Sequence, residues 1–333
     1  MERICAEGGV HDLDAARLAI AQAGGDVERA VSLLRVWAAT LPPVPVLPLT
    51  TRSLRVTRRV SAAVEDVPGG QWLGASPDFE SRMLAWPDQA IDPDDDTDGN
   101  GSSPHDRAGA SGDGVGRPNG DAPEGGATGE PAWRAGPPDR SEVPRISALL
   151  ADVGQVPVRR AEVAEDGPDP FEAPLVLPAS RGARLAALAR GETGALVSLA
   201  STAMTDRRET IVAELTTMTA SVAVPHPRTG RPAVIAEVTL TEAEVIHDAE
   251  VANRPGLAIG YGVSLGRLER RAIAIAILDG AIETGGLEEG SVLGAVDGLA
   301  TSGFVDHLRL PHYASFASYL ARVEASDDEE FES

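Results

Sequence analysis

Two histidines stand five residues apart in the segment GFVDHLRLPHY, residues 303 to 313, on either side of Pro311. Imidazole is a common zinc ligand and proton carrier, so His307 and His312 are candidate metal ligands or catalytic acids. A spacing of five does not place two side chains on one helix face, and a proline disfavours helix before it, so the rings could converge only from a loop. Zinc usually needs more protein ligands, and Asp306 is the only candidate nearby. The residues alone leave core filling open as well.

The basic residues restrict phosphate chemistry. All 29 of them are arginines, which excludes a P-loop lysine, a Schiff-base lysine and a lysine general base. A phosphate group would be bound by arginine forks or backbone amides. The net charge of -22 argues against a nucleic-acid surface, because a duplex is bound by neutralising its phosphates.

Two arginine clusters are candidate anion sites. Alternating apolar residues predict a strand over residues 54–60 that brings Arg55, Arg58 and Arg59 near one another. The alternative is that they pair with the acidic surface. The second cluster lies at the start of the most apolar segment, a helix predicted from about Leu265 to Ile282.

This predicted helix has Ser264 as its N-cap, and its Ala and Ile residues predict burial. Arg267, Arg270 and Arg271 lie in its first two turns, where the helix dipole favours anions. Either an anion binds nearby, or the arginines pair with Glu269 and neighbouring carboxylates.

The remaining elements predict an α+β fold. Residues 1–42 are expected to form a small helical module, with Asp26 as an N-cap after a Gly-Gly break. An arginine-rich strand and turn segment, residues 43–87, joins it to a main domain over residues 144–325. There a helix pair and two β-rich segments predict an antiparallel sheet. His247, among several carboxylates, is expected on a surface.

Two segments have no expected core. Residues 88–143 are acidic and rich in Gly and Pro, which predicts a disordered insert, and residues 326–333 form an acidic tail. The single cysteine excludes intrachain disulfides, and neither a signal peptide nor an apolar run long enough to span a bilayer is found. We therefore expect a cytoplasmic protein.

Taken together, four segments resemble one family, the I subunits of the carbon-phosphorus lyase core complex. They are GGDVERAVSLLRVW, RRVSAAVEDVPGGQWLG, GYGVSLGRLERRAIAIAILDGAI and GFVDHLRLPHYASF, in that order. The VPGGQWLG and HLRLPHY pieces are the most specific. A ubiquitin-associated module carries a pattern similar to the first segment, which leaves a binding module covering residues 7–40 as an alternative.

The resemblance implies a role in bacterial phosphonate use. The implied reaction is attack of a phosphonate oxygen on C1 of the ribose of MgATP, with release of adenine and formation of ribose 1-phosphonate 5-triphosphate. The I subunit is the implied nucleosidase component and transferase subunit. Its implied partners are the G, H and J subunits and a second I subunit. A non-catalytic scaffold in the same complex is the other alternative.

The resemblance also implies site residues. The two metal-coordinating histidines of the family fall on His307 and His312, near the contact with J, and zinc is the metal favoured by imidazole. Water or a partner subunit would complete the metal's coordination.

Residue types suggest the other roles. Loss of adenine through an oxocarbenium-like ribose needs an acid at the base or a carboxylate near C1, and the candidates are Asp66, Glu269 and Asp279. The triphosphate needs bidentate donors, for which Arg58, Arg59 and Arg270 are the candidates.

Two departures from the family pattern stand out. The chain lacks an N-terminal segment with a Gly-Gly element, which leaves open whether it has the activity that the resemblance implies. The acidic insert is longer than the family requires, which a surface loop tolerates.

Overall fold

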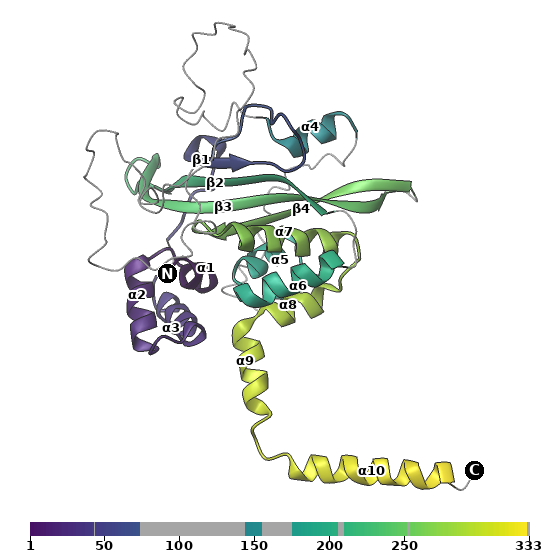
Figure 1. Ribbon diagram of the computed structural model, residues 1–333. Helices are drawn as coiled ribbons and strands as arrows, with labels where there is room; N and C mark the ends of the chain where they lie inside the picture. Colours follow the sequence, from purple (N-terminus) through teal and green to yellow (C-terminus); the bar gives the residue numbers. More distant parts are fainter. Residues whose placement is uncertain (43, 74–143, 155–174, 206–209, 252–253, 332–333) are drawn as a thin grey trace, which may run out of the picture. The chain divides into compact units, whose positions relative to one another are not determined.

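The computed structural model describes residues 1–42, 44–73, 144–154, 175–205, 210–251 and 254–331. The acidic insert predicted for residues 88–143 lies outside these ranges, as does part of the predicted joining segment. The described part contains helices and an antiparallel sheet, which confirms the α+β class (Figure 1).

The sheet has four strands in the order β1-β2-β3-β4, each antiparallel to its neighbour. Its strands are β1 (Leu54–Val60), β2 (Thr210–Pro225), β3 (Pro232–Val251) and β4 (Arg254–Leu265). Val, Ile and Thr recur along β2 and β3, and these β-branched side chains suit a pleated surface. The predicted sheet is thus confirmed.

One face of the sheet packs against α7 (Glu269–Glu283), a helix with buried Ala and Ile residues on most of its surface. Two glycines of β4 allow this contact. A Cβ on Gly260 would lie 1.9 Å from the carbonyl oxygen of Ala276, and a Cβ on Gly262 would lie 2.1 Å from that of Ala272. Only glycine permits such an approach of strand to helix.

Burial of the predicted helix is confirmed, but its predicted start is wrong. Ser264 pairs with Thr241 inside β4, and the N-cap of α7 is Leu268. The strand continues to Leu265 because its residues up to this point pair with β3. The turn that follows uses Gly266, whose φ of 80° favours glycine.

His247 is also placed differently from the prediction. It lies in β3 and is only 1% exposed, so the expectation of a surface position is wrong. Residues 243, 245 and 247 share one face of the strand, and Ala243 and Val245 are fully buried on it. His247 packs so closely on α7 that a Cβ on Gly280 would lie 2.3 Å from its ring.

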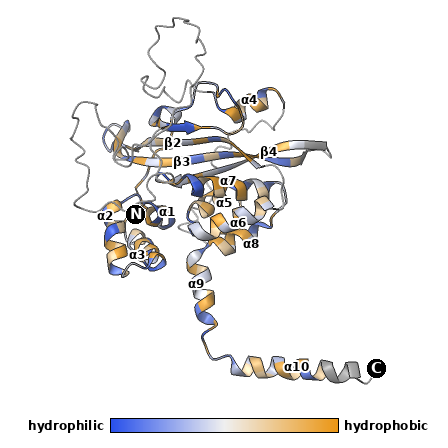
Figure 2. Cartoon of the chain, viewed as in Figure 1, coloured by the Kyte–Doolittle hydropathy of each residue, from blue (hydrophilic) through white to orange (hydrophobic). Residues whose placement is uncertain are grey.

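A second helical layer completes the main core. It consists of α5 (Arg181–Ala189), α6 (Thr193–Thr205) and α8 (Glu289–Val296), and hydrophobic residues recur along it (Figure 2). Leu188, Leu196, Ile275, Leu278 and Val296 are among the residues buried between these helices, α7 and the sheet. The predicted helix pair over residues 180–204 is confirmed by α5 and α6.

The first residues form α1 (Glu2–Gly8), α2 (Leu13–Gln22) and α3 (Val27–Ala39), with a core of their own. The predicted N-cap is confirmed, since the Asp26 side chain accepts a hydrogen bond from the Arg29 backbone. Glu7 of α1 accepts hydrogen bonds from the backbone and side chain of Thr193 at the start of α6.

The other helices are α4 (Ile146–Asp152), α9 (Gly298–His307) and α10 (Tyr313–Phe331). Helix α4 packs Ile146 against the sheet face opposite α7. Within the described ranges, no helix is both long and apolar enough to cross a bilayer.

Candidate functional site

The start of α7 brings three of the predicted site residues together. Arg58 of β1 donates from Nε to Glu269 Oε1, and both side chains are buried. Arg270 follows Glu269 directly and is exposed. Glu269 lies in the first turn of α7, where the helix dipole favours its negative charge.

Arg59 lies on the opposite face of the sheet from Arg58. It donates from Nε and Nη2 to Glu214 and from its Nη atoms to the carbonyl oxygens of Pro68, Gly70 and Pro144. Adjacent residues of a strand point to opposite faces, so Arg58 and Arg59 do not converge on one ligand. This corrects the expectation that they lie near one another, and the Arg59 donors serve the fold.

The groups around Glu214 lower its pKa. Burial alone would raise the pKa of Glu214, but the hydrogen bond from Arg59, the charges of Arg145 and Arg59, and the Ile146 backbone outweigh burial and lower it. Glu214 is therefore held as a carboxylate that joins β2 to the start of α4.

The other arginines near α7 pair with the first helix rather than with Glu269. Arg267 donates to Glu2, and Arg271 donates to the Thr193 hydroxyl and lies 3.8 Å from Glu7. These contacts explain Arg267 and Arg271, two of the three arginines that were candidates for an anion at the helix start. The third, Arg270, is exposed, and so is Arg267.

Asp279 is fully buried and surrounded by donors. It accepts hydrogen bonds from Arg181 and Arg184 of α5 and from the backbone N–H of Tyr261 at 2.9 Å. With both oxygens in use, this carboxylate is suited to joining α5, α7 and β4.

Asp66 lies on the exposed loop after β1, apart from the pairs formed by Glu269 and Asp279. The structure therefore does not gather the three candidate carboxylates at one place. Each remains a prediction for the catalytic role.

The two histidines converge as the spacing required. Helix α9 ends at His307, α10 begins at Tyr313, and the two rings lie 4.8 Å apart between their centroids, edge to face. His312 Nε2 lies 3.1 Å from the carbonyl oxygen of His307. A carbonyl only accepts, so Nε2 donates, and Nδ1 of His312 keeps its lone pair for a proton or a metal.

The fit to zinc is partial. Across the described ranges, no group of three or more His, Cys, Asp or Glu side chains converges as a metal site would require. Asp306, the further ligand considered, lies 3.1 Å from Arg309 in an ion pair. His307 and His312 can supply two nitrogens, and other ligands would come from water or another chain.

A groove adjoins the histidine segment. It has a volume of about 330 Å³ and is lined by residues of α3, α6, α8 and α9 and of the segments beside them, among them Glu28, Glu192, Thr301, Asp306 and Arg309. Its carboxylates, hydroxyls and guanidinium suit a polar ligand.

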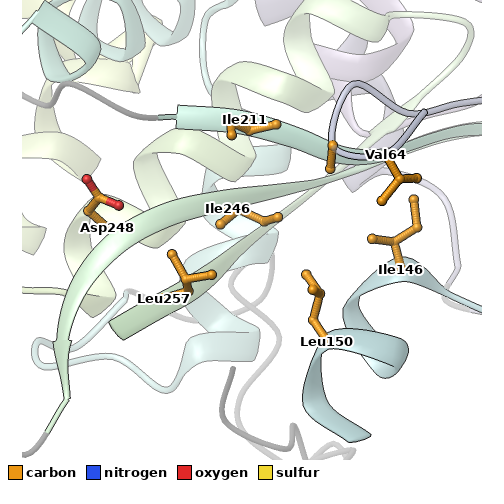
Figure 3. Close-up of a pocket in the computed structure, with 8 residues that line it drawn as sticks. Val64, Ile146, Leu150, Ile211, Ile246, Asp248 and Leu257 are labelled. Atoms are coloured by element: carbon orange, nitrogen blue, oxygen red, sulfur yellow. The ribbon is translucent and has the colours of Figure 1, made fainter. Parts of the chain in front are cut away.

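A second pocket, of about 140 Å³, lies between α4 and the sheet (Figure 3). Figure 3 shows Ile146, Leu150, Ile246 and Leu257 around an apolar space, with the Asp248 carboxylate at one side. None of the candidate site residues lines it.

Sequence reasoning missed a buried polar cluster beside this pocket. Arg145 pairs with Glu242 and lies 3.5 Å from Glu244, and the Tyr261 hydroxyl donates to Glu242. Burial disfavours the charged guanidinium, but these carboxylates outweigh burial and raise the pKa of Arg145. The available signal was the spacing of two residues between Glu242 and Glu244 in β3, which places both carboxylates on one face.

Comparison with known proteins gives a consistent answer. The family model described as "Bacterial phosphonate metabolism protein (PhnI)" matches residues 1–330. A relative from Stutzerimonas stutzeri, named "Putative C-P lyase subunit protein HtxH", is 33% identical over 98% of this chain and 84% of its own length.

Two further relatives share one name. "Alpha-D-ribose 1-methylphosphonate 5-triphosphate synthase subunit PhnI" is the name of proteins from Escherichia coli (strain K12) and Rhizobium meliloti (strain 1021), each 30% identical to this chain. The alignments cover 99% and 97% of this chain, and 87% and 82% of the relatives. The chain therefore belongs to the PhnI family of bacterial phosphonate metabolism proteins.

Proposed function

We propose that the chain takes part in displacing adenine from MgATP by a phosphonate, as the nucleosidase component of a carbon-phosphorus lyase complex. A phosphonate oxygen forms a bond to C1 of the ribose while the bond from C1 to adenine N9 breaks. The electron pair stays on adenine, which takes a proton, and the other product is ribose 1-phosphonate 5-triphosphate. The observation that carries the proposal is the family match over nearly the whole chain.

We assign recognition of the triphosphate to the start of α7. Arg270 is exposed there, and the buried pair of Arg58 with Glu269 holds β1 against this helix end. A guanidinium binds phosphate oxygens with two parallel donors, and a chain without lysine has no ammonium for the task. Arg270 is the candidate best placed to reach a ligand in solvent.

The candidate acids differ in what their surroundings allow. Asp279 and Glu269 are buried, and each carboxylate forms an ion pair with an arginine of the fold. Asp66 is exposed and remains the candidate free to approach a ribose or a base.

Zinc is assigned to His307 and His312. A bound zinc ion would act as a Lewis acid or lower the pKa of a bound water. The backbone carbonyl that accepts from His312 Nε2 orients this ring and presents Nδ1. We propose that a partner subunit or water supplies the remaining ligands.

The partners proposed are the G, H and J subunits, together with a second copy of this chain. Helices α9 and α10 support an assembly role, because hydrophobic and hydrophilic residues alternate along both (Figure 2). Phe316, Tyr319, Leu320 and Val323 follow the i, i+3, i+4, i+7 pattern of a buried helix face, yet all are exposed. Such a face is typical of a helix that docks on another chain.

The decisive test measures adenine release by chromatography. The reaction contains MgATP, methylphosphonate and the complex of this chain with the G, H and J subunits, beside the same mixture without this chain. Release that depends on the chain supports the proposal. An intact complex that releases no adenine would contradict it.

Replacing Arg270 by alanine is expected to raise the KM for MgATP about tenfold or more, because a charge-assisted bidentate contact contributes about 1.5–3 kcal/mol. Arg270 is exposed, so the melting temperature should stay close to that of the parent chain. Steady-state kinetics of the complex measure the effect. Arg17→Ala, an exposed arginine on α2, is the matched control. An unchanged KM in the Arg270 variant would remove this residue from the site.

Arg270 is a better probe than Arg58. Truncating Arg58 would leave the Glu269 carboxylate buried without its partner, at a cost of about 3–5 kcal/mol, so loss of activity could follow from unfolding.

His312→Ala is expected to lower the zinc content of the purified complex to half or less, because it removes one of the two nitrogens that this chain supplies. Elemental analysis of the complex after dialysis measures the metal. His11→Ala, at an exposed position before α2, serves as the control. Equal zinc in the parent and the His312 variant would exclude this site.

A scaffold role is the second candidate. It is favoured by the ion pairs that Glu269 and Asp279 form, since these carboxylates then serve the fold. A complex that assembles and releases adenine normally with both Asp66→Asn and Arg270→Ala would favour it. A ubiquitin-associated binding module accounts only for residues 7–40, whereas the family match spans residues 1–330.

A further inference from the structure

The hairpin of β2 and β3 extends beyond the strands that flank it (Figure 1). β2 and β3 pair as far as Pro225 and Pro232, but β4 pairs with β3 only up to the Leu240–Leu265 pair. The Gly266 backbone still donates to the Thr239 carbonyl oxygen, but among the described residues no strand lies on the β4 side of residues 232–238. Their outward N–H and C=O groups form an open sheet edge.

The other edge of the same hairpin is covered. β1 ends at the pair of Leu54 with Ala220, and beyond it the Leu47 backbone donates to the carbonyl oxygen of Ala223. The segment of residues 44–49 contains Pro45 and Pro48, which cannot donate to a further strand. The hairpin therefore protects one edge and leaves the other open.

The open edge carries large apolar side chains. Val234 and Ile235 are 64% and 56% exposed, and they lie where the pairing of β3 with β2 shifts by one residue. A two-stranded ribbon is marginally stable in water, and an exposed apolar edge is a site of association with another chain. One added strand would bury part of both side chains.

The positive charge in the turn between β2 and β3 indicates which kind of segment would bind there. The turn holds Arg228 and Arg231, and in the part of the chain that the structure describes neither guanidinium forms an ion pair. A basic tip on a chain of net charge -22 is complementary to acidic residues on the incoming segment.

We propose that residues 232–238 of β3 accept an extended strand from another subunit of the complex, with apolar residues opposite Val234 and Ile235 and acidic residues beside Arg228 and Arg231. Main-chain hydrogen bonds to the open edge supply affinity, and the two faces supply selectivity. The inference rests on the chain's role as a subunit, which the proposed function shares.

A second copy of this chain fits the edge less well. β3 carries a bulge at Ile235, since Val234 pairs with Ala223 and Ala236 with Val222. A bulge disrupts the ladder locally, so antiparallel pairing of two copies about Ala236 would place both disrupted positions next to each other. Antiparallel pairing about Ala236 would also bring Arg231 of one copy toward the end of β4 in the other, where Arg267 lies.

The test uses the full chain co-expressed with the G, H and J subunits. The variant Val234→Asp/Ile235→Asp places carboxylates in the proposed contact, and we expect its affinity for the other subunits to fall about tenfold or more. The matched control is Val44→Asp/Val46→Asp, on the covered edge of the hairpin, where these valines are 55% and 52% exposed. The control should bind within about twofold of the parent. Thermal unfolding of both variants checks that they fold.

Hydrogen exchange gives a readout at the backbone. In the parent complex the outward-facing amides of residues 233–238 should exchange more slowly than in the isolated chain, because an added strand occupies their open side. Equal binding by both variants, equal loss in both, or exchange unchanged on assembly would overturn the proposal. So would a dimer of the isolated chain that the edge variant abolishes, since it would identify a second copy as the occupant. Adenine release is measured separately, so the catalytic proposal can fail while this one stands.

Discussion

Replacing Gly262 by alanine is expected to destabilise the protein by at least about 3 kcal/mol, a large part of the 5–15 kcal/mol that is typical of a folded domain. The added Cβ would lie 2.1 Å from the carbonyl oxygen of Ala272 and 2.6 Å from the backbone nitrogen of Ala276. Both atoms belong to the backbone of α7, so no side-chain rotation relieves the overlap. The helix has to move away from β4, which opens the main core.

Denaturant unfolding followed by circular dichroism measures this effect. Gly260→Ala should behave alike, because its Cβ would lie 1.9 Å from the Ala276 carbonyl oxygen. The controls are Gly182→Ala in α5 and Gly294→Ala in α8, where a Cβ would meet open space. We expect these two variants to gain about 0.5–1 kcal/mol from helix propensity. A Gly262 variant as stable as the parent would contradict the close contact.

The sequence allowed the burial of α7 to be predicted, but not the purpose of the glycines before it. In the sequence, Gly260 and Gly262 precede Ser264, the predicted N-cap of this helix. In the structure both glycines belong to β4, and because they lack a Cβ the backbone of α7 can approach the strand. The approaching atoms belong to Ala272 and Ala276, and this contact is decided by how the helix packs on the sheet.

The convergence of His307 and His312 was predicted correctly, whereas the position of His247 was not, and the difference lies in whether local or long-range contacts decide each one. The convergence of His307 and His312 follows from local rules, since Pro311 separates two helices and the rings meet across the break. The burial of His247 depends on how β3 faces α7. The alternation that places it beside Val245 was present in the sequence, but the acidic neighbours suggested a solvated surface instead.

Arg58 and Arg59 show most clearly which contacts could not be predicted from the sequence. Strand alternation alone places Arg58 and Arg59 on opposite faces, and this much was predictable. Their carboxylate partners were not, because Glu269 and Glu214 lie 211 and 155 residues away along the chain. Pairing across such distances is decided by the sheet register and by the packing of α7, so an arginine cluster read as an anion site became structural ion pairs.

Replacing Arg59 by methionine is the second change for which we expect a large loss of stability, about 3–5 kcal/mol. The variant leaves the Glu214 carboxylate buried without its hydrogen-bonded partner, and the carbonyl oxygens of Pro68, Gly70 and Pro144 without their donor. Arg55→Met, on the exposed side of the same strand, should change stability by no more than about 0.5 kcal/mol. Urea unfolding at neutral pH compares the two.

The pH dependence of the loss separates this pair from a general packing defect. In the parent, the lowered pKa of Glu214 stabilises the fold above the unfolded value of about 4.3, and that contribution disappears as the pH falls through the folded value. In the Arg59 variant burial is opposed less, so the folded pKa rises and protonation relieves the buried charge. The difference in stability between parent and variant should therefore shrink as the pH is lowered from 7 toward about 4.

Arg59→Met/Glu214→Met removes both charges and should be more stable than the sum of the single effects predicts, because no uncompensated charge remains. A difference that stays constant with pH, or single effects that simply add, would show that the ion pair does not determine the stability of this face of the sheet.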